Sequence, residues 1–215
     1  MNVIDHNEPA YRRRWRASGG NMFNGAFYYS KEIVANIIPN VDTDRGWVTV
    51  NVPRKAFDHS IVFVHNNLNP ERYEWLRRFR DLVLVCGVPS TVEKVSHIGK
   101  AVYLPLSVDV GYVEQFRCEK DRDAAFFGRK GKSVGHDFGG ADVVFGVKRE
   151  KMLPMMARYR RVYAVGRTAI EAKILGCEVL PYDERFPDPS FWKVVDNREA
   201  AAMLQEILDG IDGRL

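Results

Sequence analysis

The sequence predicts an α/β fold made of two small Rossmann-like lobes with parallel sheets and a cleft between them. Short apolar runs alternate with helix-like segments over most of the chain, which is typical of parallel βα units. The alternation pauses at the charged stretch Lys120–Asp123 and then starts again. The 215 residues also fit two lobes of about 100 residues each, which lies within the usual size of a domain.

In the first half, residues 26–38 carry an apolar stripe at helical spacing, and Pro39 is expected to end that helix. The all-apolar runs Ile61–Val64 and Leu82–Cys86 predict strands buried on both faces. Asn69 followed by Pro70 predicts a helix start. The remaining elements expected here are strands over 47–52 and 101–106, and helices over 69–80, 90–99 and 112–116.

In the second half, strands are expected over 124–127, 142–145 and 161–165, each followed by glycine, and over 179–182. Helices are expected over 150–159, 168–175 and 198–208, the second closed by Gly176. We therefore divide the chain into a basic N-terminal arm over 1–21, a first lobe over 22–107 and a second lobe over 108–215.

Composition indicates a globular cytoplasmic protein. Hydrophobic residues make up 46% and charged residues 28%. The longest apolar runs fall short of the ~20 residues of a membrane span, and no apolar stretch follows the basic start as in a secretory signal. The three cysteines lie far apart, which argues against a disulfide framework, and we expect Cys86 and Cys177 in the core.

The net charge is only +4, but the arginines are clustered. One cluster comprises Arg12, Arg13, Arg14 and Arg16, with Tyr11 and Trp15 interleaved. Arginines among aromatic residues can contact phosphates and stack on bases, so DNA is a candidate partner of the first cluster. The alternative is a solvated helix face or flexible terminus. Two further clusters, over 77–80 and 158–161, are expected to be solvated faces.

Ligands of open parallel sheets bind beyond the carboxyl ends of the strands, so the loops there hold the candidate site residues. After the strand over 124–127 come Gly128, Arg129 and Lys132, in which glycines admit a ligand and cations suit a diphosphate. The stretch is not a P-loop because the motif GxxxxGK[ST] is absent. It could equally be a basic surface turn.

A second candidate follows the strand over 161–165. There Gly166, Arg167 and Thr168 open a helix whose first N–H groups could bind an anion, and Glu171 lies one turn further on, within reach of ribose hydroxyls. Plain capping of the helix by Thr168, with Glu171 as its partner in a capping box, explains the same residues.

Two residues are candidates for general-base catalysis. His65 follows the strand over 61–64, where an imidazole could take a proton from a substrate hydroxyl, although a lone histidine is more often structural. Asp109 follows the strand over 101–106 and is the weaker candidate. No His, Cys or carboxylate cluster suggests a metal, so no metal is expected.

Three stretches resemble the nucleotide-binding lobe of GT-B fold glycosyltransferases. Tyr103–Asp109 resembles the crossover between the lobes, and Ala125–Arg129 resembles the strand whose Arg, with a nearby Lys, binds the donor diphosphate. Gly166–Ala172 with Gly176–Pro181 resembles the family's "EAlacGtPVi" helix and strand, in which the Glu matching Glu171 holds the ribose. Tyr163 stands where retaining members carry a second Glu.

The resemblance implies a compact glycosyltransferase that uses a nucleotide sugar, UDP- or GDP-linked, without a metal. The acceptor would be a hydroxyl, with modified DNA as one option. The short chain leaves little room for acceptor loops, which a second subunit of a homodimer could supply. The alternative class is a degenerate GT-B-like protein that binds a nucleotide or a partner without turnover. A small Rossmann-like hydrolase or epimerase fits least, because no GxGxxG follows the first strand.

Overall fold

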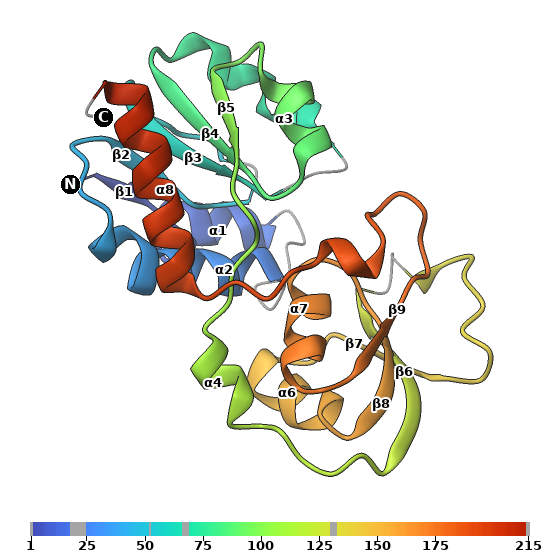
Figure 1. Cartoon of the computed structure of the whole chain (residues 1–215). Helices are drawn as coiled ribbons and strands as arrows, with labels where there is room; N and C mark the ends of the chain where they lie inside the picture. Colours follow the sequence, from blue (N-terminus) through green and yellow to red (C-terminus); the bar gives the residue numbers. More distant parts are fainter. Residues whose placement is uncertain (1, 18–24, 52, 66–68, 130–132, 214–215) are drawn as a thin grey trace. The chain divides into compact units, whose positions relative to one another are not determined.

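The computed structural model describes residues 2–17, 25–51, 53–65, 69–129 and 133–213. The chain forms two compact α/β units, each built on a parallel sheet (Figure 1). The first unit contains residues 2–17, Ala26–Pro105 and 197–213, and the second contains Leu106–Asp196. The predicted α/β class with two parallel sheets is therefore confirmed.

The first unit holds a five-stranded sheet in which each strand lies beside the next one along the chain. The order is β1-β2-β3-β4-β5, and all four pairs are parallel. The strands are β1 (Val3–Ile4), β2 (Gly46–Val48), β3 (Ser60–Val64), β4 (Leu82–Cys86) and β5 (Lys100–Tyr103). Because the sheet grows in one direction only, it has no topological switch point among the described strands.

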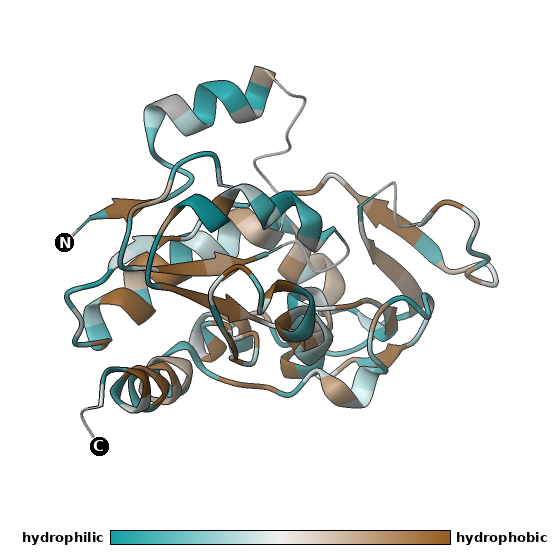
Figure 2. Ribbon diagram, turned by 90° about the horizontal axis from the view of Figure 1, so that it is seen from above, coloured by the Kyte–Doolittle hydropathy of each residue, from teal (hydrophilic) through white to brown (hydrophobic). Residues whose placement is uncertain are grey.

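Helical segments cover both faces of this sheet, as the apolar runs predict. The 3-10 helix η3 (Pro70–Arg78) and α3 (Pro89–Val95) pack on the face that presents Val62 and Leu84. The helix α2 (Gly25–Glu32) and the π-helical turn η1 (Ile33–Ile37) lie on the other face, where Tyr29 contacts Phe63 edge-to-face. A 3-10 turn, η2 (Ile38–Asn40), ends the segment at Pro39 as predicted. Figure 2 shows the apolar strands between these layers.

The C-terminal helix α8 (Asn197–Asp212) belongs to the first unit, whereas the sequence placed all of 108–215 in the second lobe. It packs against η1. Buried Asn197 donates a hydrogen bond to Glu32 (2.8 Å), and Arg45 contacts Asp212 (2.6 Å) at the other end of the helix. With η3 and α3 on the opposite face, α8 is what completes the cover of the sheet.

The N-terminal residues also differ from the expected arm over 1–21, because residues 3–17 are built into the fold. Strand β1 pairs with β2, and Ile4 and Tyr11 are buried. Helix α1 (Pro9–Ala17) follows and carries the first arginine cluster. Strand β1 could not be predicted from the sequence, because a strand of two residues is too short to show an apolar pattern.

The second unit holds a four-stranded parallel sheet in the order β7-β6-β8-β9. Its strands are β6 (Arg122–Gly128), β7 (Asp142–Phe145), β8 (Tyr159–Tyr163) and β9 (Glu178–Leu180). Its helical segments are α4 (Val110–Glu114), α6 (Arg149–Met156), α7 (Arg167–Ile174) and η4 (Pro189–Phe191). From β6 the chain moves to one side and from β8 to the other, so the topological switch point lies between β6 and β8.

A single lysine holds the carboxyl ends of two helices in the second unit. The Lys120 ammonium donates hydrogen bonds to the Ala157 carbonyl (2.6 Å) and the Leu175 carbonyl (2.7 Å), which end α6 and α7, and contacts buried Cys177 (3.3 Å). A cation at helix carboxyl ends stabilises the carbonyls that lack intrahelical partners. Cys86 and Cys177 are buried, as predicted.

No helix within the described ranges is both long and apolar enough to span a membrane.

We expect Lys120→Met to lower the free energy of unfolding by about 1.5–3 kcal/mol, because hydrogen bonds from a charged donor are lost and two carbonyls are left unsatisfied. Urea unfolding followed by circular dichroism measures the effect. Lys151→Met, at an exposed position of α6, is the matched control and should change stability by less than about 0.5 kcal/mol. Equal effects of the two substitutions would contradict this role of Lys120.

A charged cluster closes the amino ends of the strands in the first unit. His59 contacts Asp44 (Nε2 to Oδ1, 2.9 Å) and Asp81, and buried Arg45 contacts Asp81 (3.1 Å). The hydrogen bond to Asp44 and the one to Asp81 raise the pKa of His59 above its ordinary value of 6.5. Both His59 and Asp81 have positive φ (54° and 52°), a backbone conformation that Asn tolerates better than most residues.

A raised pKa in the folded state means that His59 stabilises the fold fully below pH 6.5 and loses this effect as the pH rises through the raised value. His59→Asn keeps the backbone conformation accessible, so its melting temperature should fall below that of the wild type most at about pH 5–6 and least at about pH 9. Thermal unfolding of both proteins across this range is the measurement. Lys94→Gln, at an exposed position of α3 in the same unit, serves as control. A deficit that is the same at every pH would refute the proposed charge interaction.

Candidate functional site

The candidate site of the second unit is the carboxyl edge of its sheet at the β6/β8 switch point. Gly128 ends β6 and Arg129 follows it, while Gly166 lies just beyond β8 and α7 begins at Arg167. Because β6 and β8 pair in parallel, both loops emerge at the same edge. The topology thus brings together the two stretches that the sequence singled out, at the position where α/β sheets bind ligands.

Gly166 gives α7 its start. Its backbone (φ 63°, ψ −141°) lies in a region that is essentially restricted to glycine, and it occupies the position before the first helical residue. Capping by the Thr168 side chain is therefore wrong, because Thr168 lies inside the first turn. No hydrogen bond among the described residues uses the Thr168 amide, which is the condition for binding an anion there.

Gly128 leaves room for an aromatic core under the same edge. A Cβ at this position would lie 2.5 Å from Cζ of Phe126, whose ring is fully buried. Phe138, from the loop after β6, stacks on Phe126 (4.6 Å between centroids), and Tyr182 packs edge-to-face on it (5.2 Å). These rings fix the loop after β6 against the sheet.

Arg129 is exposed, and within the described part of the chain no carboxylate forms an ion pair with it. Desolvation lowers the pKa of Arg129, but an arginine remains charged at neutral pH. Its guanidinium is thus a cation available to an anionic ligand. Lys132, the other predicted cation of this loop, lies outside the described residues.

Glu171 and Arg167 form a buried ion cluster instead of an open binding surface. Glu171 is 3% exposed and accepts a hydrogen bond from Arg149 of α6 (2.7 Å). Arg167 lies 3.9 Å from the same carboxylate oxygen, and its Nε donates to the Ser107 carbonyl (3.0 Å). The Arg149 guanidinium also lies over the ring of Tyr112 (5.1 Å). The cluster joins α6, α7 and the segment that enters the unit.

The two candidate bases lie in different units. Asp109 accepts a hydrogen bond from the Tyr112 amide (2.9 Å) and caps α4 in the second unit. His65 follows β3 in the first unit, half-buried beside Phe63 and Tyr29. Its Nε2 lies 2.7 Å from the Thr49 carbonyl, which can only accept, so Nε2 carries a proton.

Two polar residues that lie beyond the carboxyl ends of strands were not identified from the sequence. Asp183, just beyond β9, has a buried side chain that Arg185 contacts through two hydrogen bonds (2.8 and 2.7 Å). The hydrogen bond from Arg185 lowers the pKa of Asp183, so the carboxylate stays ionised. His6, beyond β1, is 1% exposed, and burial lowers its pKa to about 3. Lone polar residues after short strands carry no motif that could have marked them.

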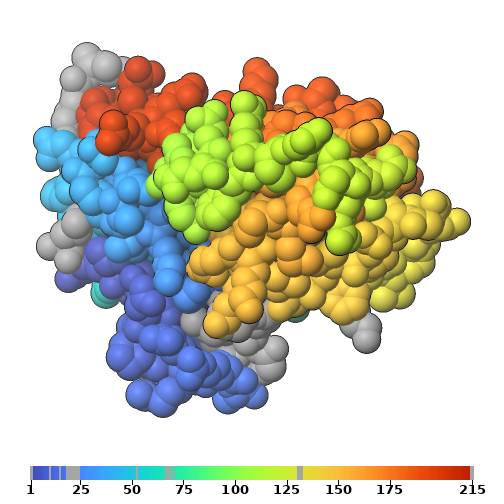
Figure 3. All heavy atoms as spheres, turned by 90° about the horizontal axis from the view of Figure 1, so that it is seen from below, coloured from blue at the N-terminus to red at the C-terminus, as the bar shows by residue number. Residues whose placement is uncertain are grey.

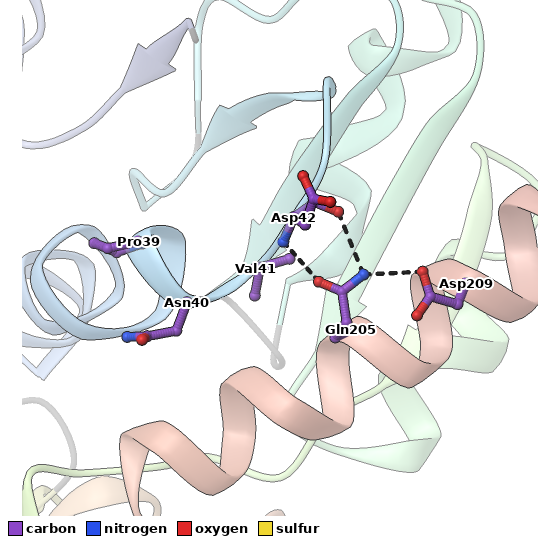
Figure 4. Close-up of a pocket in the computed structure, with 6 residues that line it drawn as sticks. All are labelled: Pro39, Asn40, Val41, Asp42, Gln205 and Asp209. Carbon is purple, nitrogen blue, oxygen red and sulfur yellow. Dashed lines mark hydrogen bonds between the residues drawn. The ribbon is translucent and has the colours of Figure 1, made fainter. Parts of the chain in front are cut away.

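A pocket of about 760 Å³ lies beside η2 and α8 in the first unit, and none of the predicted site residues lines it (Figure 4). Gln205 accepts from the Asp42 amide (2.6 Å) and donates to the Asp42 carbonyl and to Asp209. Pro39, Asn40 and Val41 complete the lining. Gln205 thus joins α8 to the backbone of Asp42, and we assign this contact a structural role.

Within the described ranges, no group of three or more His, Cys, Asp or Glu residues could hold a metal ion. The chain matches no protein-family model, no curated protein and no solved structure.

Glu171→Gln should lower the free energy of unfolding by about 3–5 kcal/mol, because it leaves the buried guanidinium of Arg149 without its counter-charge. The double variant Arg149→Met/Glu171→Met removes both charges and should recover a substantial part of that loss. Urea unfolding of the wild type and both variants tests this double replacement. A double variant less stable than Glu171→Gln would show that the ion pair itself stabilises the unit.

Proposed function

We propose that the protein is a glycosyltransferase-like enzyme whose second unit binds the diphosphate of a nucleotide sugar at the β6/β8 switch point. One observation carries the proposal. At this switch point an exposed arginine without a carboxylate partner among the described residues, Arg129, and the amino end of α7 emerge from neighbouring strands. A guanidinium and helix amides together form the usual protein environment of a phosphate.

The chemistry that these groups support is departure of a nucleoside diphosphate from the sugar. Negative charge grows on the diphosphate as the glycosidic bond breaks, and fixed donors stabilise that charge best when they are in place beforehand. Gly166 and the ion cluster behind α7 hold the helix start in position. Backbone amides at a fixed helix start need little reorganisation during the reaction.

The structure changes the roles we propose for two residues. Glu171 is engaged with Arg149 and Arg167, so we propose that it orients α7 and leaves the ribose to other groups. The side chain of Arg167 points into the same cluster, so its contribution to the site is positional. His65 remains the first proposed base, and Asp109, whose carboxylate caps α4, remains the second.

The second candidate function is a protein that binds a nucleotide or another polyphosphate without turnover. The burial of Glu171 favours it, since the ribose contact that the family resemblance implies is absent from this arrangement. A homodimer is compatible with either proposed function, whereas a modified base of DNA as the acceptor belongs to the transferase proposal alone.

Isothermal titration with UDP, GDP and their glucose conjugates tests the donor site. We expect binding of at least one of them, weakened by about 10- to 100-fold in Arg129→Ala, because a hydrogen bond to a charged group contributes about 1.5–3 kcal/mol. Arg160→Ala, at an exposed position of the same unit, should leave the affinity unchanged. If none of these nucleotides binds, the proposal fails.

Turnover separates the two candidates. Release of the free nucleoside diphosphate from a bound nucleotide sugar, measured by a coupled assay with and without acceptors, supports the transferase. Binding without release on any hydroxyl acceptor supports the polyphosphate-binding protein.

A further inference from the structure

The three arginine clusters of the sequence differ in their partners. In the second cluster, Arg78 donates to the Trp75 carbonyl (3.0 Å) and Arg80 pairs with Asp58 (3.8 Å). In the third, Arg158 pairs with Asp121 and Arg161 with Asp123 (2.6 Å). In the first, none of Arg12, Arg13, Arg14 and Arg16 has an ion pair or a side-chain hydrogen bond among the described residues.

Helix α1 holds the first cluster on a fixed support. The Tyr11 hydroxyl donates to the Asn51 carbonyl, the Tyr11 ring packs edge-to-face on His6 (5.0 Å), and Glu8 accepts from the Tyr11 amide (2.6 Å). Arg13, Arg14 and Arg16 are exposed. Figure 3 shows the N-terminal residues, in dark blue, as a projection, and Figure 2 shows α1, beside the grey trace, mostly in teal.

The charge of this helix is unfavourable by itself. Its nine residues, Pro9–Ala17, contain four arginines and no carboxylate. Arg12 and Arg16 are four residues apart and Arg13 and Arg16 three apart, so like charges face each other on the helix surface. A helix of this length is also marginal without tertiary support. Binding of a polyanion would remove the repulsion, whereas in a solvated helix only Arg14 and Arg16, in the last turn, gain from the helix dipole.

We propose that α1 binds the phosphate backbone of a nucleic acid. Arginine forks match phosphate oxygens bidentately, and the three exposed ones lie within a single turn. An anionic membrane is less suitable, because interfacial helices insert an apolar face, and Tyr11 of α1 points into the core. Contacts to the backbone alone make the binding independent of base sequence.

The contacts of α1 place its arginines near the carboxyl ends of β2 and β3 in the first unit. Asn51, which accepts from Tyr11, lies beyond β2, and His65 lies directly beyond β3, so both follow the carboxyl ends of neighbouring parallel strands. A nucleic acid on α1 would therefore run close to the sheet edge that carries His65. A role of the nucleic acid as acceptor rests on the proposed function, whereas its binding to α1 does not.

Fluorescence anisotropy of the full chain with a duplex DNA and a single-stranded RNA, without any nucleotide sugar, tests the proposal. We expect binding, and we expect the logarithm of the association constant to fall linearly with the logarithm of the salt concentration. Arg13→Gln/Arg14→Gln/Arg16→Gln should reduce the slope on duplex DNA by about 2–3 and weaken binding at least about tenfold in ~100 mM salt. Glutamine is a good helix former, so α1 should persist.

The matched control is Arg77→Gln/Arg78→Gln/Arg80→Gln, which also removes three arginine charges, at exposed positions in and just after η3 of the same unit. Its slope and affinity should stay within about twofold of the wild type. Equal losses in both triple variants would mean that net charge alone attracts the nucleic acid, and would overturn the proposal. Absence of nucleic-acid binding at low salt, or binding to phosphatidylserine vesicles in its place, would overturn it as well.

Discussion

Parallel strand pairing is the constraint on which the rest of this structure depends. Every strand pair in the described sheets is parallel, so the carboxyl ends of the strands in each unit meet at one edge. Parallel neighbours need crossover segments, and in the first unit these bury both faces of the central strands β3 and β4. The edges are then the places where loops and helix starts collect. His65 follows this rule in the first unit, and Arg129 and Gly166 follow it in the second.

The sequence predicted most elements because their signals are local. Leu82–Cys86 and Asp142–Phe145 are apolar runs bounded by charged residues or glycine, and the strands coincide with them. The strand order could not be predicted from the sequence, because it depends on which edge of the sheet each new strand joins. The switch point between β6 and β8, the strongest indication of a site, therefore emerges only from the fold. Likewise α8 carries a clear helical pattern that does not reveal which unit it covers.

The candidate site shows how burial decides between two uses of one residue type. Arg129 and Arg167 each follow a glycine after a strand, and the sequence predicted both as ligand-binding residues. Arg129 is exposed, whereas Arg167 is 8% exposed and bonded to Ser107. The partner of Glu171 is Arg149, 22 residues upstream and across strand β8, so no local motif could show it. Short-range patterns identified the candidate residues, and long-range pairing decided which of them can meet a ligand.

The ion cluster behind α7 also connects stability to the proposed chemistry. A buried carboxylate between two guanidiniums is costly to place in a protein interior, and breaking it costs more than removing it whole. It ties α7 to α6 and to Ser107, so the helix start cannot shift freely relative to β8. Donors fixed in this way bind an anion with less loss of conformational freedom than flexible side chains do. In the proposed phosphate site, Glu171 therefore acts by holding α7 in position and does not contact the ligand.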